Sequence, residues 1–278
     1  MIVRKSPAKV NLYLEVLGKR EDGYHEIATL MQEISLCDEM VFLPGGRDLR
    51  LRCPGGELPE DGRNLVFRAA SLLFSHAGTS PGVEIEIRKR IPIAAGLGGG
   101  SSNAATALKA LNEIFGFGLG PEDLAKIGVR VGADVPFFLY GRTAWALGIG
   151  ERLFPAEGVP PMWFVLVNPG FAVSTRAVYE GLNLRLTKEM IQFSIPKFLS
   201  LQDFAGGLRN DLERVTLGFH PELLGIKREL MRHGALGSLM SGSGPTVFGV
   251  FAGREQAEKA EKALRSEGFG SVWTARSL

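Results

Sequence analysis

Apolar and polar residues alternate near the start of the chain, from Lys9 to Val16. A period of two predicts a strand whose successive side chains point to opposite faces of a sheet. Lys9 and Asn11 then lie on the same face, opposite the apolar one. The pattern therefore presents an amine and an amide together.

The same alternation over residues 83–88 predicts a second strand, which we expect to end at Pro92. Between residues 104 and 115, apolar side chains recur at the spacing of a helix. That helix is expected to begin near Ser101 or Ser102. A strand, a glycine-rich connection and a helix thus follow one another.

The connection between them carries four glycines and two serines, and residues 92–102 are called the glycine loop below. Glycines let the backbone approach a ligand closely, and the N–H groups at a helix start attract anions. The Walker lysine and the dinucleotide fingerprint G-x-G-x-x-G are both missing. The alternative is a flexible turn capped by a serine, but the flanking strand and helix favour a phosphate-binding loop of another type.

Helical spacing also predicts helices that start at Asn64 and at Pro121, the second ending near Gly132. Two adjacent prolines before an apolar strand mark a shift in composition, which we interpret as a domain boundary near Gly158. The predicted domains are 1–158 and 159–278. The second half predicts a strand, helices, a hairpin, a helix and a final strand, so both halves are expected to be α+β domains.

The composition is typical of a globular protein, with 278 residues of which 45% are hydrophobic. A net charge of +2 is too mild to favour nucleic acid as a partner, although small anions fit. Cys37 and Cys53 give no disulfide framework and no metal spacing, and the histidines are scattered. No apolar run approaches the roughly 20 residues of a membrane span. We expect a cytoplasmic protein with no metal site of its own and no membrane partner.

Phosphoryl transfer to an alcohol needs charge neutralisation, alignment and a group that receives or orients the hydroxyl proton. Asp134 is the candidate base, and Lys9 is the candidate positive charge. Pro136 disfavours a helical Val135, so Asp134 is expected at a helix-to-strand corner. A nearby Lys9 would favour its ionised carboxylate. The alternatives are a solvated surface lysine and a turn aspartate.

The segment SGSGPT from Ser241 is either a hairpin turn or a second close approach to an anion.

Three segments, SPAKVNLYLEV, PIAAGLGGGSSNAATAL and SGSGPTVF, resemble in order and spacing the three motifs of the GHMP kinases. Within that superfamily, GKREDGYHEI, NLV, GADVPFF and LRNDLE resemble the family of 4-diphosphocytidyl-2-C-methyl-D-erythritol kinases, which belong to the non-mevalonate isoprenoid pathway. The resemblance implies an α+β, two-domain GHMP kinase fold. Its N-terminal domain would be like domain 2 of ribosomal protein S5, and its C-terminal domain would be ferredoxin-like.

The resemblance implies ATP-dependent phosphorylation of the 2-hydroxyl of the methylerythritol unit, with Asp134 as base, Lys9 as its charged partner and Asn11 orienting the substrate. ATP would be the co-substrate, and Mg²⁺ is expected to arrive with it. The segment covering the ATP phosphates would be Pro92, Ile93, Ala94, Ala95, Gly96, Leu97, Gly98, Gly99, Gly100, Ser101 and Ser102. Asn64, Lys89 and Asn103 would lie near the adenosine.

By the same resemblance, Tyr24 and Tyr179 would stack on the cytosine ring of the small-molecule substrate, while His25 would bond to its edge. Every base offers a π face, but only the edge distinguishes cytosine. One rival is another GHMP kinase such as homoserine kinase, which is not expected to carry Tyr24 and His25. A second rival, of another class, is a non-catalytic nucleotide- or RNA-binding module. The oligomeric state is not predicted.

Overall fold

The structure, a computed structural model, describes residues 1–56, 58–184, 193 and 200–278. The chain divides into two compact units, each built from separate stretches of sequence. Unit 1 comprises Met1–Ala8, Cys37–Pro92 and Gly98–Arg142, and unit 2 comprises Lys9–Leu36, Ile93–Leu97 and Thr143–Leu278. The domain boundary near Gly158 stays a prediction.

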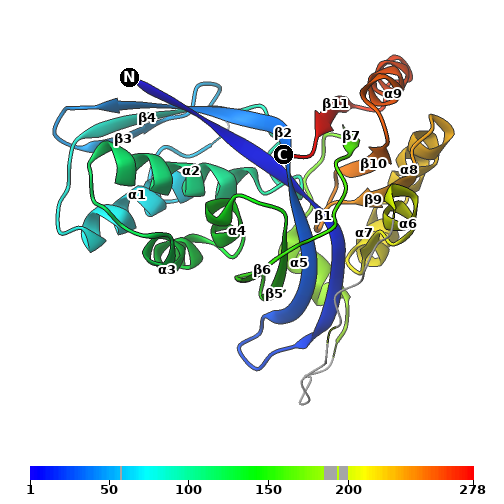
Figure 1. Ribbon diagram of the computed structural model, residues 1–278, viewed down its shortest axis with the longest axis horizontal. Coiled ribbons are helices and arrows are strands. Elements are labelled where there is room, and N and C mark those ends of the chain that lie inside the picture. Colours follow the sequence, from blue (N-terminus) through cyan, green and yellow to red (C-terminus); the bar gives the residue numbers. More distant parts are fainter. Residues whose placement is uncertain (57, 185–192, 194–199) are drawn as a thin grey trace. The chain divides into compact units, whose positions relative to one another are not determined.

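Unit 1 combines part of a sheet with a group of helices. Two long strands, β1 (Ile2–Lys19) and β2 (His25–Pro44), contribute residues to both units. In unit 1, the second half of β2 pairs antiparallel with β4 (Val83–Arg88), and β4 pairs parallel with β3 (Leu49–Arg52). The helices pack on one another beside these strands (Figure 1); they are α1 (Leu65–His76), α2 (Gly99–Ile114), α3 (Pro121–Val131) and α4 (Val135–Tyr140).

Several predicted elements of unit 1 are confirmed. The alternating residues Val83, Ile85 and Ile87 are completely buried in β4, although the strand ends at Arg88 and not at Pro92. Asn64 caps α1, because its side chain accepts a hydrogen bond from the N–H of Val66. The helix α3 has its proline in the first turn and Gly132 at its end, as expected.

Two predictions about helix boundaries are wrong. The helix after the glycine loop begins at Gly99, so Ser101 and Ser102 lie inside it. Asp134 is not at a helix-to-strand corner, because α4 follows it directly. Pro136 lies in the first turn of α4, where its missing N–H costs no hydrogen bond, and the restriction on Val135 is overcome there.

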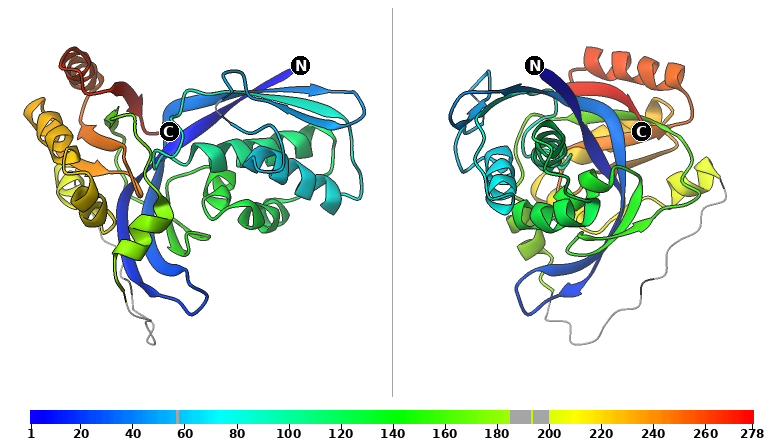
Figure 2. Two further views of the ribbon diagram at one scale, coloured as in Figure 1. Left: turned by 180° about the vertical axis from the view of Figure 1, so that it is seen from behind. Right: turned by 60° about the vertical axis from the view of Figure 1, so that its left-hand side comes forward.

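Unit 2 contains a four-stranded antiparallel sheet in the order β11-β7-β10-β9. Its strands are β7 (Trp163–Asn168), β9 (Gly237–Met240), β10 (Val247–Phe251) and β11 (Ser271–Arg276). The helices in the described part of this half are α5 (Thr175–Gly181), α6 (Leu201–Gly206), α7 (Glu213–Phe219), α8 (Leu223–Arg232) and α9 (Arg254–Ser266). Both α8 and α9 pack against this sheet (Figure 2). The four strands and the two helices that pack on them follow one another as β7, α8, β9, β10, α9 and β11, and in this strand order they form the ferredoxin-like arrangement that the resemblance implied.

The first half of β2 and the second half of β1 complete unit 2. Here β2 pairs with β5 (Ala144–Gly148), β5 pairs with β6 (Arg152–Pro155), and β1 pairs with the short β8 (Arg209–Asn210). A core cluster of unit 2 joins Leu14 of β1 to residues of the four-stranded sheet and its helices. In the described part of the chain, the structure has no helix whose length and apolarity would let it cross a membrane.

Candidate active site

Lys9 is a buried residue of unit 2, with 4% of its surface exposed. Its Nζ atom donates to the side-chain oxygen of Asn11 and, at 3.1 Å, to the backbone carbonyl of Gly96. Its backbone N–H donates to the carbonyl of Leu97 at 3.0 Å. A buried ammonium needs such hydrogen bonds to offset its lost hydration. The structure therefore places Lys9 on the glycine loop and excludes the solvated surface lysine.

The orientation of Asn11 is fixed by its neighbours. Its Nδ2 atom donates to Oγ1 of Thr29 at 2.9 Å, and that hydroxyl donates to the carbonyl of Tyr13 at 2.7 Å. With its Nδ2 committed to Thr29, the amide turns its oxygen to Lys9. Sequence reasoning did not single out Thr29, which lies in an apolar stretch of β2.

The turn that begins at Ser241 packs directly on the glycine loop within unit 2. The Ser241 hydroxyl donates to the carbonyl of Gly96 at 2.9 Å, and a Cβ added to Gly96 would lie 2.1 Å from the Ser241 carbonyl oxygen. Asn210, from the LRNDLE segment, holds this turn by donating to the carbonyls of Met240 and Gly242 at 2.8 and 2.7 Å. The SGSGPT segment thus forms a turn and also contacts the glycine loop.

The glycine loop uses left-handed backbone at three residues, with φ of 51° at Ala94, 75° at Gly96 and 68° at Gly98. Ala94 is uncommon there, because a Cβ disfavours this conformation. Gly98 occupies the N-cap of α2 and provides no side-chain capping bond. The serine-capped turn is therefore not what forms, and the N-terminal end of α2 keeps the polarity that attracts anions.

The predicted ATP segment differs in exposure along its length. Pro92, Ile93, Ala94, Gly96, Gly98, Gly100 and Ser101 are exposed or half-buried, whereas Ala95, Leu97, Gly99, Ser102 and Asn103 are buried. Ser102 is completely buried, and its hydroxyl bonds to that of Ser6 at 2.7 Å. Its hydroxyl thus has a partner inside unit 1.

Two of the residues predicted near the adenosine, Lys89 and Asn103, meet in unit 1, with Nζ of Lys89 3.4 Å from Oδ1 of Asn103. Lys89 also pairs with Asp38, a buried acid that sequence reasoning missed. The third, Asn64, uses its side chain to cap α1 and to bond the carbonyl of Pro59 at 2.9 Å.

Asp134 belongs to unit 1, where it is half-buried at the N-cap of α4. Its carboxylate makes no capping hydrogen bond to that helix. Lys9 belongs to unit 2, and the pairing of the two residues stays a prediction.

The three residues predicted to bind cytosine all belong to unit 2. Tyr24 is unusually exposed for a large ring, at 59%. The rings of His25 and Tyr179 lie 5.0 Å apart between centroids with an angle of 32° between their planes. Burial, assisted by the charge of Lys19, lowers the pKa of His25 below its usual 6.5. The imidazole is therefore neutral at neutral pH and offers one donor and one acceptor.

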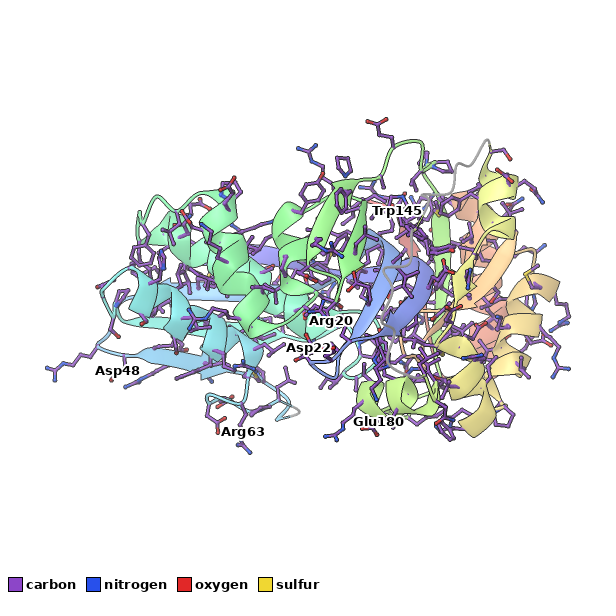
Figure 3. All side chains as sticks on the ribbon, turned by 90° about the horizontal axis from the view of Figure 1, so that it is seen from below. Arg20, Asp22, Asp48, Arg63, Trp145 and Glu180 are labelled. Carbon is purple, nitrogen blue, oxygen red and sulfur yellow. The ribbon has the colours of Figure 1, made fainter. Side chains whose placement is uncertain are left out.

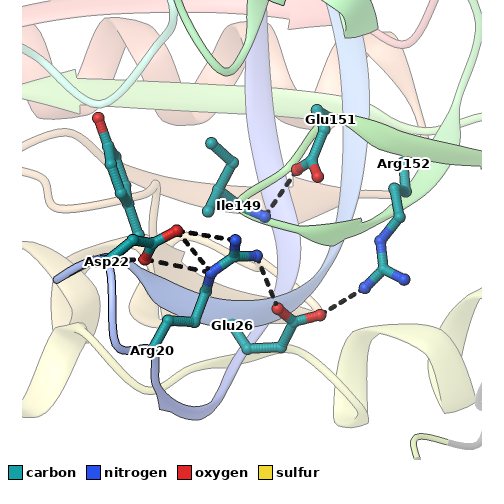
Figure 4. Close-up of polar contacts among 7 residues, drawn as sticks. Arg20, Asp22, Glu26, Ile149, Glu151 and Arg152 are labelled. Atoms are coloured by element: carbon teal, nitrogen blue, oxygen red, sulfur yellow. Dashed lines mark hydrogen bonds and ion pairs between the residues drawn. The ribbon is translucent and has the colours of Figure 1, made fainter.

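Figure 4 shows a charged network on the turn that carries Tyr24, and Figure 3 labels two of its members, Arg20 and Asp22. Arg20 pairs with Asp22 at 2.8 Å and with Glu26 at 3.3 Å, and Glu26 also pairs with Arg152 of β6. The Asp22 carboxylate accepts from the N–H of Tyr24 at 3.1 Å, while the Tyr24 carbonyl accepts from the N–H of Arg20 at 2.8 Å. The hydrogen bond from Arg20 lowers the pKa of Asp22. Three members of this network, Arg20, Asp22 and Glu26, lie in the segment REDGYHE, so the charges of that segment could have indicated the network.

Glu229, His233 and Glu267 form a group on unit 2 that could hold a metal ion. Arg232 already pairs with both carboxylates, at 2.7 Å to Glu267. Because Arg232 already engages both carboxylates, we assign no metal to this group.

Known proteins resemble the chain along its whole length. The family model of the GHMP kinases N terminal domain matches residues 64–142, and that of the GHMP kinases C terminal matches residues 195–269. A 4-diphosphocytidyl-2-C-methyl-D-erythritol kinase from Syntrophus aciditrophicus is 58% identical over 98% of both chains. One from Syntrophotalea carbinolica is 50% identical over 97% of this chain and 95% of its own. A crystal structure of 4-(cytidine 5'-diphospho)-2C-methyl-D-erythritol kinase, 39% identical, has a TM-score of 0.83 and 99% coverage of each chain.

Proposed function

The chain belongs to the GHMP kinases and, within them, to the 4-diphosphocytidyl-2-C-methyl-D-erythritol kinases, and from this premise we propose how its residues perform the reaction. The reaction is the ATP-dependent phosphorylation of 4-diphosphocytidyl-2-C-methyl-D-erythritol in the non-mevalonate isoprenoid pathway. The acceptor is proposed to be the 2-hydroxyl of the methylerythritol unit. The observation that carries this assignment to a cytidylyl substrate is the exposed Tyr24 beside a His25 that contacts Tyr179.

The glycine loop is proposed to bind the ATP phosphates. Support comes from the N-terminal end of α2, from the left-handed backbone that leads to it, and from the ammonium of Lys9 on Gly96. Phosphoryl transfer depends mainly on positioning and on neutralising charge. Lys9, fixed by hydrogen bonds and withdrawn from water, supplies a positive charge that needs no reorganisation during the reaction.

Asp134 is proposed to receive or orient the proton of the acceptor hydroxyl. Asp134 is half-buried at the N-cap of α4. Asn11, with its amide orientation fixed by Thr29, is proposed to orient the acceptor. The rings of Tyr24 and Tyr179 are proposed to stack on cytosine, and the neutral His25 to bond its edge.

ATP is the phosphoryl donor, and Mg²⁺ is proposed to enter with it, held by phosphate oxygens and water. Bound in this way, Mg²⁺ would neutralise charge on the phosphates.

The proposed location is the cytoplasm, which agrees with two free cysteines. We also propose domains 1–158 and 159–278, because the two family models match on opposite sides of that boundary.

Turnover of each candidate alcohol tests the function. We expect ADP release with the cytidylyl substrate and none with homoserine or mevalonate; turnover of homoserine or mevalonate alone would assign another GHMP kinase. Asp134→Asn is expected to lower kcat about 100-fold or more while ATP binding persists. The matched control is Asp123→Asn on the surface of α3, where the side chain is 44% exposed. Nucleotide binding without ADP release from any alcohol would instead indicate a non-catalytic module.

A further inference from the structure

Asp38 is a buried acid to which the reaction described above gives no role. It lies in β2 with 1% of its surface exposed, in unit 1. A buried carboxylate is costly unless it is fully hydrogen-bonded, so its contacts indicate what it does.

The two oxygens of Asp38 receive four donors. Oδ1 accepts from the backbone N–H groups of Arg90 and Ile91 at 2.7 and 2.9 Å. Oδ2 accepts from Nδ2 of Asn103 at 3.0 Å and pairs with the ammonium of Lys89. An ionised carboxylate has about four acceptor positions, so the carboxylate of Asp38 is fully used.

These donors stand at the two points where the chain enters and leaves the glycine loop. Arg90 and Ile91 come immediately before Pro92, and Asn103 lies near the start of α2, which begins at Gly99. Asn103 in turn donates to the hydroxyl of Ser6 at 2.9 Å. One carboxylate thus connects the strand side of the loop to its helix side.

The same carboxylate also fixes Lys89 against the start of α2. A Cβ added to Gly99 would lie 3.1 Å from Nζ of Lys89, so the ammonium contacts the first residue of the helix. The N-terminal end of a helix is itself positive and repels a cation. Asp38 offsets this repulsion, which a neutral amide of the same shape would not do.

We propose that Asp38 is a positioning residue for the nucleotide, because it fixes both ends of the glycine loop and places Lys89 beside the start of α2. The proposal rests on the proposed function, since it takes ATP as the ligand of the loop. ATP then meets a loop whose ends are set before binding, and less conformational freedom is lost on binding.

The test is the nearly isosteric variant Asp38→Asn, measured by steady-state kinetics with each substrate varied in turn. We expect KM for ATP to rise about tenfold or more, because charge-assisted hydrogen bonds are lost. We expect KM for the cytidylyl substrate to change less than about twofold. Asp48→Asn, which removes the same charge from an exposed turn of unit 1 (Figure 3), is the matched control and should leave both constants unchanged.

A merely structural role predicts another pattern. Loss of folded protein would lower the apparent kcat and leave both KM values as they are, and that result would overturn the proposal. If Asp38→Asn does not fold, Asp38→Glu keeps the charge and displaces the carboxylate by one methylene. It should show the same rise confined to ATP, by a smaller factor, and an unchanged KM for ATP would again overturn the proposal.

A double-mutant cycle with Lys89→Gln tests whether Asp38 affects KM for ATP through Lys89. If Asp38 acts through Lys89, the second substitution adds little to the rise caused by the first. Fully additive effects on KM for ATP would contradict this route. A wild-type protein that does not turn over the cytidylyl substrate would refute the proposed function, whereas an active wild type with an unaffected Asp38→Asn variant would refute only the role of Asp38.

Discussion

The imidazole of His25 lies against the phenol ring of Tyr179, with the two centroids 5.0 Å apart. The residues are far apart in the sequence, one at the start of β2 and the other in α5. The sequence around Tyr179 is a weak motif, and the ring contact is what supports grouping it with Tyr24 and His25. The structure thus supports a role for Tyr179 that the sequence around it does not indicate.

Replacing Tyr179 tests whether this grouping has a function. Tyr179→Ala is expected to raise KM for the cytidylyl substrate about tenfold or more, since a base that stacks on an aromatic ring gains about 1–3 kcal/mol. Tyr179→Phe keeps the ring and should stay close to wild type. Steady-state kinetics with ATP saturating gives the values. Equal KM values for the Ala and Phe variants would contradict the stacking role.

The lowered pKa of His25 predicts a pH-dependent stability. In the unfolded chain His25 titrates near its usual pKa of 6.5, whereas in the folded protein burial lowers the pKa. Between these two pKa values the unfolded chain binds more protons, so the free energy of unfolding rises with pH. The contribution is fully present above about pH 6.5 and is lost as the pH falls through the folded-state pKa.

The measurement is urea unfolding of the wild type and of His25→Gln between about pH 8 and about pH 5, a range that brackets the usual histidine pKa. The wild type should lose more stability than the variant on the acid side. Parallel curves for the two proteins would contradict the prediction. Lys19 contributes to the shift, so Lys19→Gln should reduce the difference.

Lys9→Met tests the buried charge on the glycine loop. Removing a preorganised charge from a site that excludes water typically lowers kcat about 100-fold or more. The methionine keeps much of the side-chain volume, so folding should persist, which circular dichroism checks. Lys126→Met, on a side chain that is 74% exposed, is the control and should keep the wild-type kcat. A variant of Lys9 with unchanged kcat would exclude the proposed role.

Gly96→Ala and Gly78→Ala form a matched pair at left-handed backbone positions, with φ of 75° and 64°. Both substitutions introduce a Cβ where it is disfavoured, which costs about 1–2 kcal/mol. Only at Gly96 does the new atom also meet backbone, 2.1 Å from the Ser241 carbonyl oxygen. We expect Gly96→Ala to be the more destabilised in thermal unfolding and to lose turnover. Equal melting temperatures for the two variants would contradict the prediction, because they would show that the glycine loop and the turn at Ser241 move apart at little cost.

Periodicity predicted the elements whose neighbours agree with their local pattern. The alternation of residues 83–88 gave β4, and the helical spacing after Asn64 and Pro121 gave α1 and α3. The prediction for Asp134, which rested on Pro136 and not on periodicity, failed because the restriction that a proline places on its predecessor is a statistical preference that packing overcomes. Buried Val135 and Phe137 show that α4 is held by its apolar face.

The candidate site was less accessible to sequence reasoning. The glycine loop and the Tyr24–His25 pair are contiguous and could be found as motifs. The burial of Lys9 could not be predicted from the sequence. Its strand alternates as if one face were solvated, whereas both faces are buried from Ala8 to Leu14. Asp38 was missed for a similar reason, since its partners lie more than fifty residues away in the chain and no local pattern marks a buried acid.

The core around Leu14 joins parts of the chain that are synthesised at different times. Leu14 belongs to one cluster with Val165, Met240 and Phe251, whereas every residue of unit 1 precedes position 143. At about 5–20 residues per second, a ribosome makes these partners on the order of tens of seconds after Leu14. Leu14 and the neighbouring Val16 of β1 therefore lack this core while all the residues of unit 1 have already been synthesised. We expect this part of the nascent chain to bind chaperones.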